Sequence, residues 1–211
     1  MTTSGVTVDK EGTVTGNTYD KYGSSNPVVR RMMAGFTATL DELFDKATPA
    51  SLLDVGCGEG VLVHEWAQKI DGRVVGIDLD DPQLHEQWAE RQAPNLEYRV
   101  MKAENLPFVD HEFDVATAIE VLEHVPDPTA TLAEMARCAT RYLIVSVPRE
   151  PLWRALNMAR GAYWKDLGNS PGHVNHWSKL SFVQLLSGYG EVVEGRSPFP
   201  WTMLLVRLPG A

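Results

Sequence analysis

The chain is poor in cysteine and has no long apolar segment. Its 211 residues include two cysteines, and Cys57 and Cys138 form no CxxC pair. This count argues against a disulfide scaffold and is typical of a protein kept in a reducing compartment. No run approaches the roughly 18 apolar residues of a membrane span, and the N-terminal residues lack the apolar core of a signal peptide. We therefore expect a cytoplasmic protein without a membrane span.

Basic residues are also in deficit. Lys and Arg together number 19 against 28 Asp and Glu, which leaves a formal net charge of −9. This charge opposes non-specific binding to nucleic acid or to an anionic membrane, although it is compatible with a local basic patch. The hydrophobic fraction is 44%, enough to bury the core of a globular protein. At this length we expect one domain rather than two.

Polarity divides the chain into regions. Residues 1–16 are polar and rich in Gly, Thr and Ser, so we expect a flexible N-terminal tail. Asn26-Pro27 is typical of a helix start, and apolar residues then recur at helical spacing, which predicts a helix over 27–46. The expected domain covers 17–211, with a lid-helix region at 17–48, a ligand-binding core at 50–147, and a substrate side with a C-terminal hairpin at 148–211.

From residue 50 onward, short apolar runs alternate with helical patterns. Strands that alternate with helices indicate βαβ units and a mostly parallel sheet. The last two strands are joined by a short connection, which favours an antiparallel pair. The predicted strands are 51–55, 73–78, 96–101, 113–119, 142–147, 190–196 and 201–208, and the predicted later helices are 62–70, 81–92, 128–138, 150–160 and 178–188.

A glycine-rich turn follows the first of these strands and reads Asp54-Val55-Gly56-Cys57-Gly58-Glu59-Gly60. Glycine has no Cβ, so a ligand can approach the backbone closely. The start of the next helix adds unpaired N–H groups that suit a carboxylate or a phosphate. Asp78 comes 18 residues after Gly60, at the end of the next strand, where an acid typically accepts the two hydroxyls of a ribose. The pattern indicates a nucleoside ligand.

Two features select among nucleoside ligands. A dinucleotide fingerprint that starts at Gly56 needs a third glycine at position 61, where the chain has Val61. The carboxylate of Asp54 suits the ammonium group of an aminoacyl ligand, whereas it would repel a pyrophosphate. Both features favour S-adenosylmethionine over NAD and disfavour an NAD-linked oxidoreductase.

Four motifs in this order resemble those of class I S-adenosylmethionine-dependent methyltransferases: DVGCGEG, GIDLD, AENLPF and FDVATAIEVLEHVPDP. The resemblance spans roughly residues 19–190 and is greatest to the small-molecule branch that includes ubiquinone and menaquinone biosynthesis enzymes. It implies a Rossmann-like α/β fold, with a seven-stranded, mostly parallel sheet, an antiparallel strand near the C-terminus and helices on both faces.

The resemblance also implies a cofactor site. The methionine part would lie at Asp54, Gly56 and Gly58, with Cys57 as a small residue in the same turn. Asp78 would bind the ribose and Leu79 the adenine. The other implied contacts are Ala103, Glu104 and Asn105 at the adenine, Glu120 beside the methyl group, and Tyr22 in a lid over the cofactor.

Carboxylate and imidazole groups also recur in the segment EVLEH. If it is helical, the i, i+3, i+4 spacing brings Glu120, Glu123 and His124 to one face. A distant His173 or His176 would complete a set suited to Zn, Mn, Fe or Mg, which would acidify a bound hydroxyl. The pattern is similar to metal-dependent 2′-O-methyltransferases of small RNAs and to some ubiquinone-pathway O-methyltransferases. The alternative is a generic strand-to-helix segment that binds no metal.

Methyl transfer from a sulfonium requires alignment and deprotonation of the acceptor. His124, His173 and His176 are candidate general bases because histidine titrates near neutral pH. The alternatives are a supporting hydrogen bond for His124 and a place at a helix cap for one of the other two. Aromatic and basic residues of the last third predict an apolar or aromatic acceptor pocket with cationic groups nearby: Trp153, Tyr163, Trp164, Trp177, Trp201, Arg149, Arg154, Arg160 and Lys165.

The sequence thus predicts methyl transfer to a hydroxyl of a small, partly aromatic metabolite. It leaves open the acceptor, the methylated atom and the oligomeric state. One alternative is a metal-dependent RNA 2′-O-methyltransferase, which the net charge disfavours. The other is a protein that binds S-adenosylmethionine without catalysis.

Overall fold

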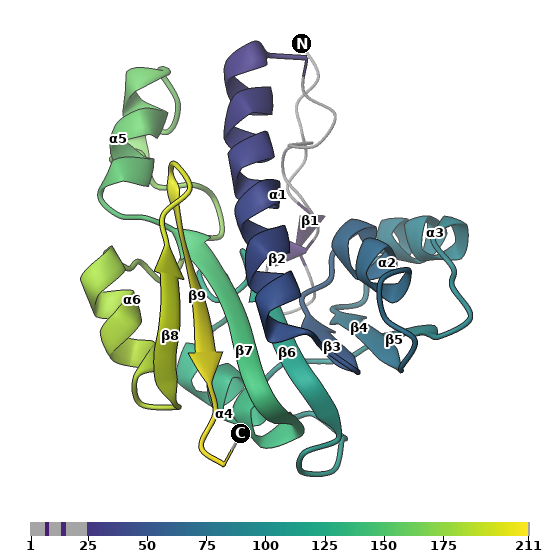
Figure 1. Ribbon diagram of the computed structural model, residues 1–211. Coiled ribbons are helices and arrows are strands. Elements are labelled where there is room, and N and C mark those ends of the chain that lie inside the picture. The colour runs from purple at the N-terminus through teal and green to yellow at the C-terminus, as the bar shows by residue number, and fades with distance from the viewer. Residues whose placement is uncertain (1–6, 9–13, 16–24, 211) are drawn as a thin grey trace.

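A seven-stranded sheet forms the centre of the molecule in the computed structural model, which describes residues 7–8, 14–15 and 25–210 (Figure 1). The strand order is β5-β4-β3-β6-β7-β9-β8. All neighbouring strands pair in parallel except β9, which is antiparallel to both β7 and β8. The strands are β3 (Leu52–Val55), β4 (Val74–Asp78), β5 (Leu96–Val100), β6 (Phe113–Ile119), β7 (Ala139–Pro148), β8 (Glu191–Arg196) and β9 (Trp201–Arg207).

Helices cover both faces of this sheet. One face packs against α1, α2 and α3, with Leu40, Trp66 and Trp88 in its core. The other packs against α4 and α6, with Leu132 and Phe182 in its core. The helices are α1 (Pro27–Ala47), α2 (Val61–Ala67), α3 (Pro82–Glu90), α4 (Pro128–Cys138), α5 (Leu152–Ala159) and α6 (Lys179–Leu186), with a short 3₁₀ helix η1 (Trp164–Asp166).

The long helix α1 begins where the sequence predicts. The side chain of Asn26 accepts a hydrogen bond from the backbone N–H of Val28, and Pro27 occupies the first helical position, where its missing N–H costs nothing. Phe44 stacks on Trp66 with ring centroids 5.1 Å apart. The apolar stripe of α1 therefore fixes this helix across the sheet face, as Figure 1 shows.

The predicted fold class is confirmed, including the antiparallel strand near the C-terminus. Strand β6 and helix α4 have the predicted bounds. Strand β7 begins at Ala139, three residues earlier than predicted, because α4 ends at Cys138 and the chain enters the sheet at once. The expected flexible tail contains a short antiparallel pair, β1 (Thr7–Val8) with β2 (Val14–Thr15). No described helix is long and apolar enough to span a membrane.

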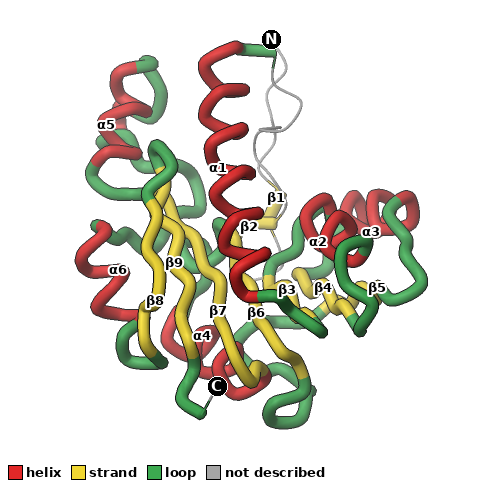
Figure 2. Tube along the Cα trace, in the orientation of Figure 1, coloured by secondary structure: helices red, strands yellow, loops and turns green. Residues whose placement is uncertain are grey.

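Strand order places the candidate site. Strand β3 lies between β4 and β6. After β3 the chain adds β4 and β5 on one side of this strand, and it then crosses back to add β6 on the other side. In an open α/β sheet, ligands bind outside the carboxyl ends of the strands at such a switch point. At the same end of the molecule, the loop between β8 and β9 lies beside α5 (Figure 2).

Candidate functional site

A cavity of about 850 Å³ opens at the carboxyl ends of β3, β4 and β6. A volume of this size accommodates a drug-sized ligand. The glycine turn and the loop after β5 line one part of the cavity, and α1, α5 and the segment Phe199–Trp201 line another. Residues that are far apart in the sequence thus form one chamber.

Positive backbone angles explain the glycines of the turn. Gly56 has φ +72° and Gly60 has φ +78°, a region that residues with a Cβ rarely adopt. A Cβ on Gly56 would collide with the side chain of Val121, and a Cβ on Gly60 would lie 2.6 Å from Tyr98 Oη. Because these contacts exclude a larger residue, the turn keeps its backbone exposed to the cavity.

Two acids lie at the polar end of the cavity. Asp54 is buried and accepts a hydrogen bond of 2.6 Å from Thr117 Oγ1, and burial raises its pKa to about 7. Asp78 accepts hydrogen bonds of 2.7 Å from the backbone N–H groups of Gly58 and Leu79. Burial also raises the pKa of Asp78, and those two hydrogen bonds oppose the rise. The pair suits a ligand that carries a cation and hydroxyl donors.

The described residues of the predicted cofactor site all line this cavity: Asp54, Gly56, Cys57, Gly58, Asp78, Leu79, Ala103, Glu104, Asn105 and Glu120. Tyr22 lies outside the described residues, so its predicted contact is untested. The Cys57 thiol is buried, and a Cβ on Gly76 would lie 3.0 Å from its Sγ. Burial raises the pKa of Cys57 well above its usual value, so the thiol stays neutral and acts as a packing residue.

The helix expected over 120–124 does not form. These residues make an irregular turn, with Glu120 at φ +61°. Pro126 disfavours helical geometry in the residue before it, and α4 starts only after Asp127, whose side chain caps the N–H groups of Thr129 and Ala130. The prediction that one turn of helix brings Glu120, Glu123 and His124 to a common face is therefore wrong.

Glu120 instead contacts the last strand of the sheet. Its Oε2 accepts a hydrogen bond of 2.5 Å from Trp201 Nε1, and its backbone N–H donates to Ser146 Oγ at 3.1 Å. Sequence reasoning missed this pairing because Trp201 is 81 residues away in the chain, and no local pattern links the two. The indole N–H fixes the carboxylate beside the cavity.

A different group of potential metal ligands does come together. Glu123, His124 and His173 each offer an atom within 4.8 Å of the others. The His124 and His173 rings meet edge to face with centroids 4.8 Å apart. His124 Nδ1 lies 3.0 Å from Gly172 O, and Asn175 Nδ2 donates to the carbonyls of Leu122 and Val125. These bonds fasten the loop that carries His173 onto the turn that carries His124.

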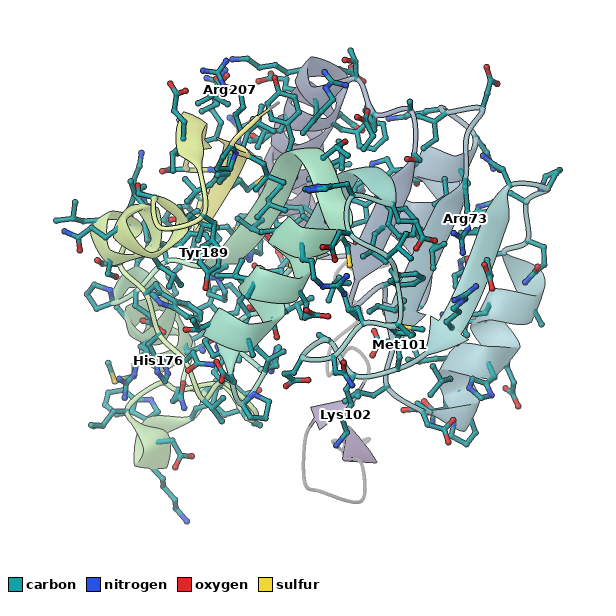
Figure 3. All side chains as sticks on the ribbon, turned by 90° about the horizontal axis from the view of Figure 1, so that it is seen from below. Arg73, Met101, Lys102, His176, Tyr189 and Arg207 are labelled. Carbon is teal, nitrogen blue, oxygen red and sulfur yellow. The ribbon has the colours of Figure 1, made fainter. Side chains whose placement is uncertain are left out.

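His176 lies outside this group. Its side chain is exposed, and Nε2 lies 2.7 Å from Asn169 Oδ1. Figure 3 shows His176 on the side of α6, far from the cavity residues Met101 and Lys102. Neither Glu120 nor His176 is brought to Glu123 and His124 as a metal ligand. Among the predicted bases, His124 and His173 line the cavity and His176 does not.

Aromatic rings enclose the other part of the cavity. Trp201 meets Phe36 of α1 at 4.8 Å and Trp153 of α5 at 5.8 Å between ring centroids. Trp153 also stacks on His173 at 6.0 Å. Tyr163 and Arg160 complete this wall. The other aromatic and basic residues noted in the last third do not line the cavity: Trp164, Trp177, Arg149, Arg154 and Lys165.

Comparisons with known proteins agree with this geometry. Residues 53–141 match a family model described as a methyltransferase domain. A ubiquinone biosynthesis O-methyltransferase of Neisseria meningitidis is 38% identical over 92 residues, which are 41% of this chain and 38% of the relative. That of Albidiferax ferrireducens is 42% identical over 95 residues, covering 42% and 35%. The chain thus spans well under half the length of these curated relatives.

Solved structures show the same fold. Magnesium protoporphyrin IX methyltransferase from Synechocystis, determined with bound S-adenosylhomocysteine, superposes with a TM-score of 0.63 and 18% sequence identity. The match covers 88% of this chain and 89% of that structure. The predicted resemblance to S-adenosylmethionine-dependent methyltransferases is therefore confirmed.

Proposed function

Because residues 53–141 match a methyltransferase-domain model, we propose that the chain transfers a methyl group from S-adenosylmethionine to a small, partly aromatic metabolite. One observation carries the proposal: a single cavity joins the Asp54 and Asp78 carboxylates at a glycine turn to two histidines and an aromatic wall. The expected cytoplasmic location is part of the same proposal.

The residues at the glycine turn fit the cofactor. Asp54 would face its ammonium group and Asp78 its ribose hydroxyls, since a carboxylate accepts hydrogen bonds from both kinds of donor. The backbone of Gly56 and Gly58 would contact the methionine part, and Leu79 with residues 103–105 the adenine. When bound, the cofactor supplies an electrophilic methyl group on a sulfonium. The protein's own task is to align the acceptor with it and to remove a proton.

His124 is the base that the geometry favours for a hydroxyl acceptor. In the tautomer in which Nδ1–H donates to Gly172 O, Nε2 is the ring nitrogen that accepts a proton. His173 lies against it and also stacks on Trp153. Trp153 and Trp201 would hold an aromatic acceptor next to these histidines. Methylation at oxygen follows from this base and stays part of the proposal.

A divalent metal is a second proposal, carried by the group Glu123, His124 and His173. One carboxylate with two imidazoles suits Zn, Mn or Fe. Such an ion would lower the pKa of a hydroxyl on the acceptor and so replace the histidine as the means of deprotonation. An RNA acceptor is disfavoured by the net charge of −9.

Radiolabelled methyl transfer from S-adenosylmethionine to a panel of phenols, catechols and other small hydroxyl compounds tests the proposal. We expect product with at least one acceptor, and a loss of roughly 10² to 10⁴-fold in His124→Ala if it is the base. A chelator would abolish transfer only in the metal mechanism, and Glu123→Ala would then do the same. S-Adenosylmethionine binding without transfer to any acceptor would favour a non-catalytic binding protein.

A further inference from the structure

One side of α5 lines the part of the cavity that the aromatic rings enclose, which we call the acceptor side. Its residues in the cavity wall are Trp153, Leu156, Asn157 and Arg160. Their spacing of i, i+3, i+4 and i+7 places them on one face of the helix. Arg160 follows the last residue of α5, and its backbone N–H still donates to Leu156 O at 3.1 Å. Because an α-helix rises about 1.5 Å per residue, Arg160 lies about 10 Å along the axis from Trp153.

A chain of hydrogen bonds holds Arg160 in place. Arg160 Nε donates to Asn157 Oδ1 at 3.1 Å, and the Asn157 side chain is buried. Asn157 Nδ2 and Trp153 Nε1 both donate to Ser170 Oγ, at 3.1 Å and 2.9 Å. The guanidinium carbon of Arg160 lies 5.8 Å from the centroid of the Tyr163 ring. Since the buried amide occupies Nε, the two terminal nitrogens of the guanidinium keep their donors for a ligand.

The positive charge of Arg160 has no counter-ion among the described residues. Arg73, Arg137 and Arg196 each pair with two carboxylates. No carboxylate in the described part of the chain forms an ion pair with Arg160. In a chain of net charge −9, a cation of this kind in a cavity wall attracts an anionic ligand.

The acids that line the cavity lie away from α5. They come from the ends of β3 and β4, the glycine turn, and the loops after β5 and β6: Asp54, Glu59, Asp78, Glu104 and Glu120. Within the described residues, no Asp or Glu after Glu120 lines the cavity. A negative group on a ligand is therefore repelled at the glycine turn and attracted at Arg160. This asymmetry orients an acidic acceptor with its other end toward His124 and His173.

We propose that the methyl acceptor is an aromatic hydroxy acid whose carboxylate binds the guanidinium of Arg160. Arginine forms two parallel hydrogen bonds with a carboxylate, and Trp153 would pack against the aromatic ring. One guanidinium balances the single charge of a carboxylate, whereas a phosphate would bring a second negative charge into a cavity lined by five acids. This inference rests on the proposed function, because it names the class of acceptor for the same transfer.

Methyl transfer to phenols and catechols, each supplied as the free acid and as its primary amide, tests the proposal. One such pair is 3,4-dihydroxycinnamate and its amide, in which two carbons separate the carboxyl group from the ring. Wild type should use the acid with a kcat/KM at least about tenfold above that of the amide.

Variants of Arg160 test whether this residue causes the preference. Arg160→Gln should remove the preference mainly by raising KM for the acid, because the contact is the same in the bound substrate and in the transition state. Arg160→Lys keeps the charge without the planar fork and should retain part of the preference. Lys165→Gln is the matched control: it removes a positive charge from a residue that does not line the cavity, and it should retain the full preference.

Four results would overturn the proposal. Wild type uses acid and amide equally, or it transfers methyl to no acid of the panel. The preference survives in Arg160→Gln, which is the behaviour of a solvated arginine. The preference is lost in Lys165→Gln, or in a variant of the cavity residue Lys102, Lys102→Gln, which would assign the anion to another cation. Calorimetry with S-adenosylhomocysteine on each protein checks that the cofactor site is folded, and a wild type that does not bind it would refute the proposed function and this inference with it.

Discussion

Replacing Asp54 by asparagine should remove a large pH dependence of stability. The Asp54 side chain is buried on the cavity floor against Thr117, and burial raises its pKa from 3.8 to about 7. Each pKa unit corresponds to about 1.4 kcal/mol, so ionisation of Asp54 in the folded protein costs about 4 kcal/mol. The amide of the Asp54→Asn variant would keep an acceptor for the Thr117 hydroxyl without the charge.

The sign of the effect follows from proton binding. Between pH 3.8 and about 7 the folded protein holds a proton on Asp54 that the unfolded chain has released. The stabilising contribution is complete below pH 3.8 and is lost as the pH rises through 7. The pKa of Asp78 is raised in the same direction. The difference between wild type and Asp54→Asn therefore reports the contribution of Asp54 together with its charge interaction with Asp78.

Urea unfolding between pH 4 and pH 8 measures this difference. We expect the free energy of unfolding of wild type to fall relative to that of Asp54→Asn by about 4 kcal/mol across the range. A difference that stays constant with pH would refute the reasoning, because Asp54 would then titrate alike in the folded and unfolded chain. A cationic ligand group favours the ionised carboxylate, so binding of S-adenosylhomocysteine at pH 6 should also release a proton in wild type that Asp54→Asn does not release.

Further variants test the turn and the Glu120 contact. Gly56→Ala should lower the free energy of unfolding by about 2 to 4 kcal/mol, because it combines a positive φ with a collision against Val121. Gly58→Ala should lower the free energy of unfolding by only about 1 kcal/mol, since no atom lies within 4 Å of its added Cβ. Equal losses of stability in the two variants, measured by urea unfolding, would contradict this account. Trp201→Phe keeps a ring against α1 but removes the donor to Glu120. A double-mutant cycle with Glu120→Ala, which removes the acceptor, should show a coupling of about 1 kcal/mol in urea unfolding, and additive effects would contradict a stabilising contact.

Local patterns in the sequence predicted most of the fold. Helix α4 begins at Pro128, directly after the cap residue Asp127, and a capping side chain followed by proline is favoured at a helix start. Strand β6 is a largely apolar run, interrupted by Asp114 and Thr117, because both of its faces are mostly buried. The acids of the cofactor site were also predictable, since Asp54 and Asp78 end adjacent parallel strands, and such ends meet at one edge of the sheet.

Contacts between distant segments could not be predicted in this way. The spacing of Glu120, Glu123 and His124 indicates a shared face only if the segment is helical, and the left-handed backbone at Glu120 prevents that. His173 reaches His124 because Asn175 binds the carbonyls of the turn, a tertiary contact without a sequence period. The choice between His173 and His176 required the path of that loop.

Isothermal calorimetry with S-adenosylhomocysteine tests the central claim, that the cavity beside the glycine turn binds the cofactor. We expect one molecule to bind per chain of wild type, and affinity to fall at least about tenfold in Asp78→Asn, which loses a charged acceptor for the ribose hydroxyls. A folded wild-type protein that gives no binding signal, or an Asp78→Asn variant that binds as tightly as wild type, would contradict the account.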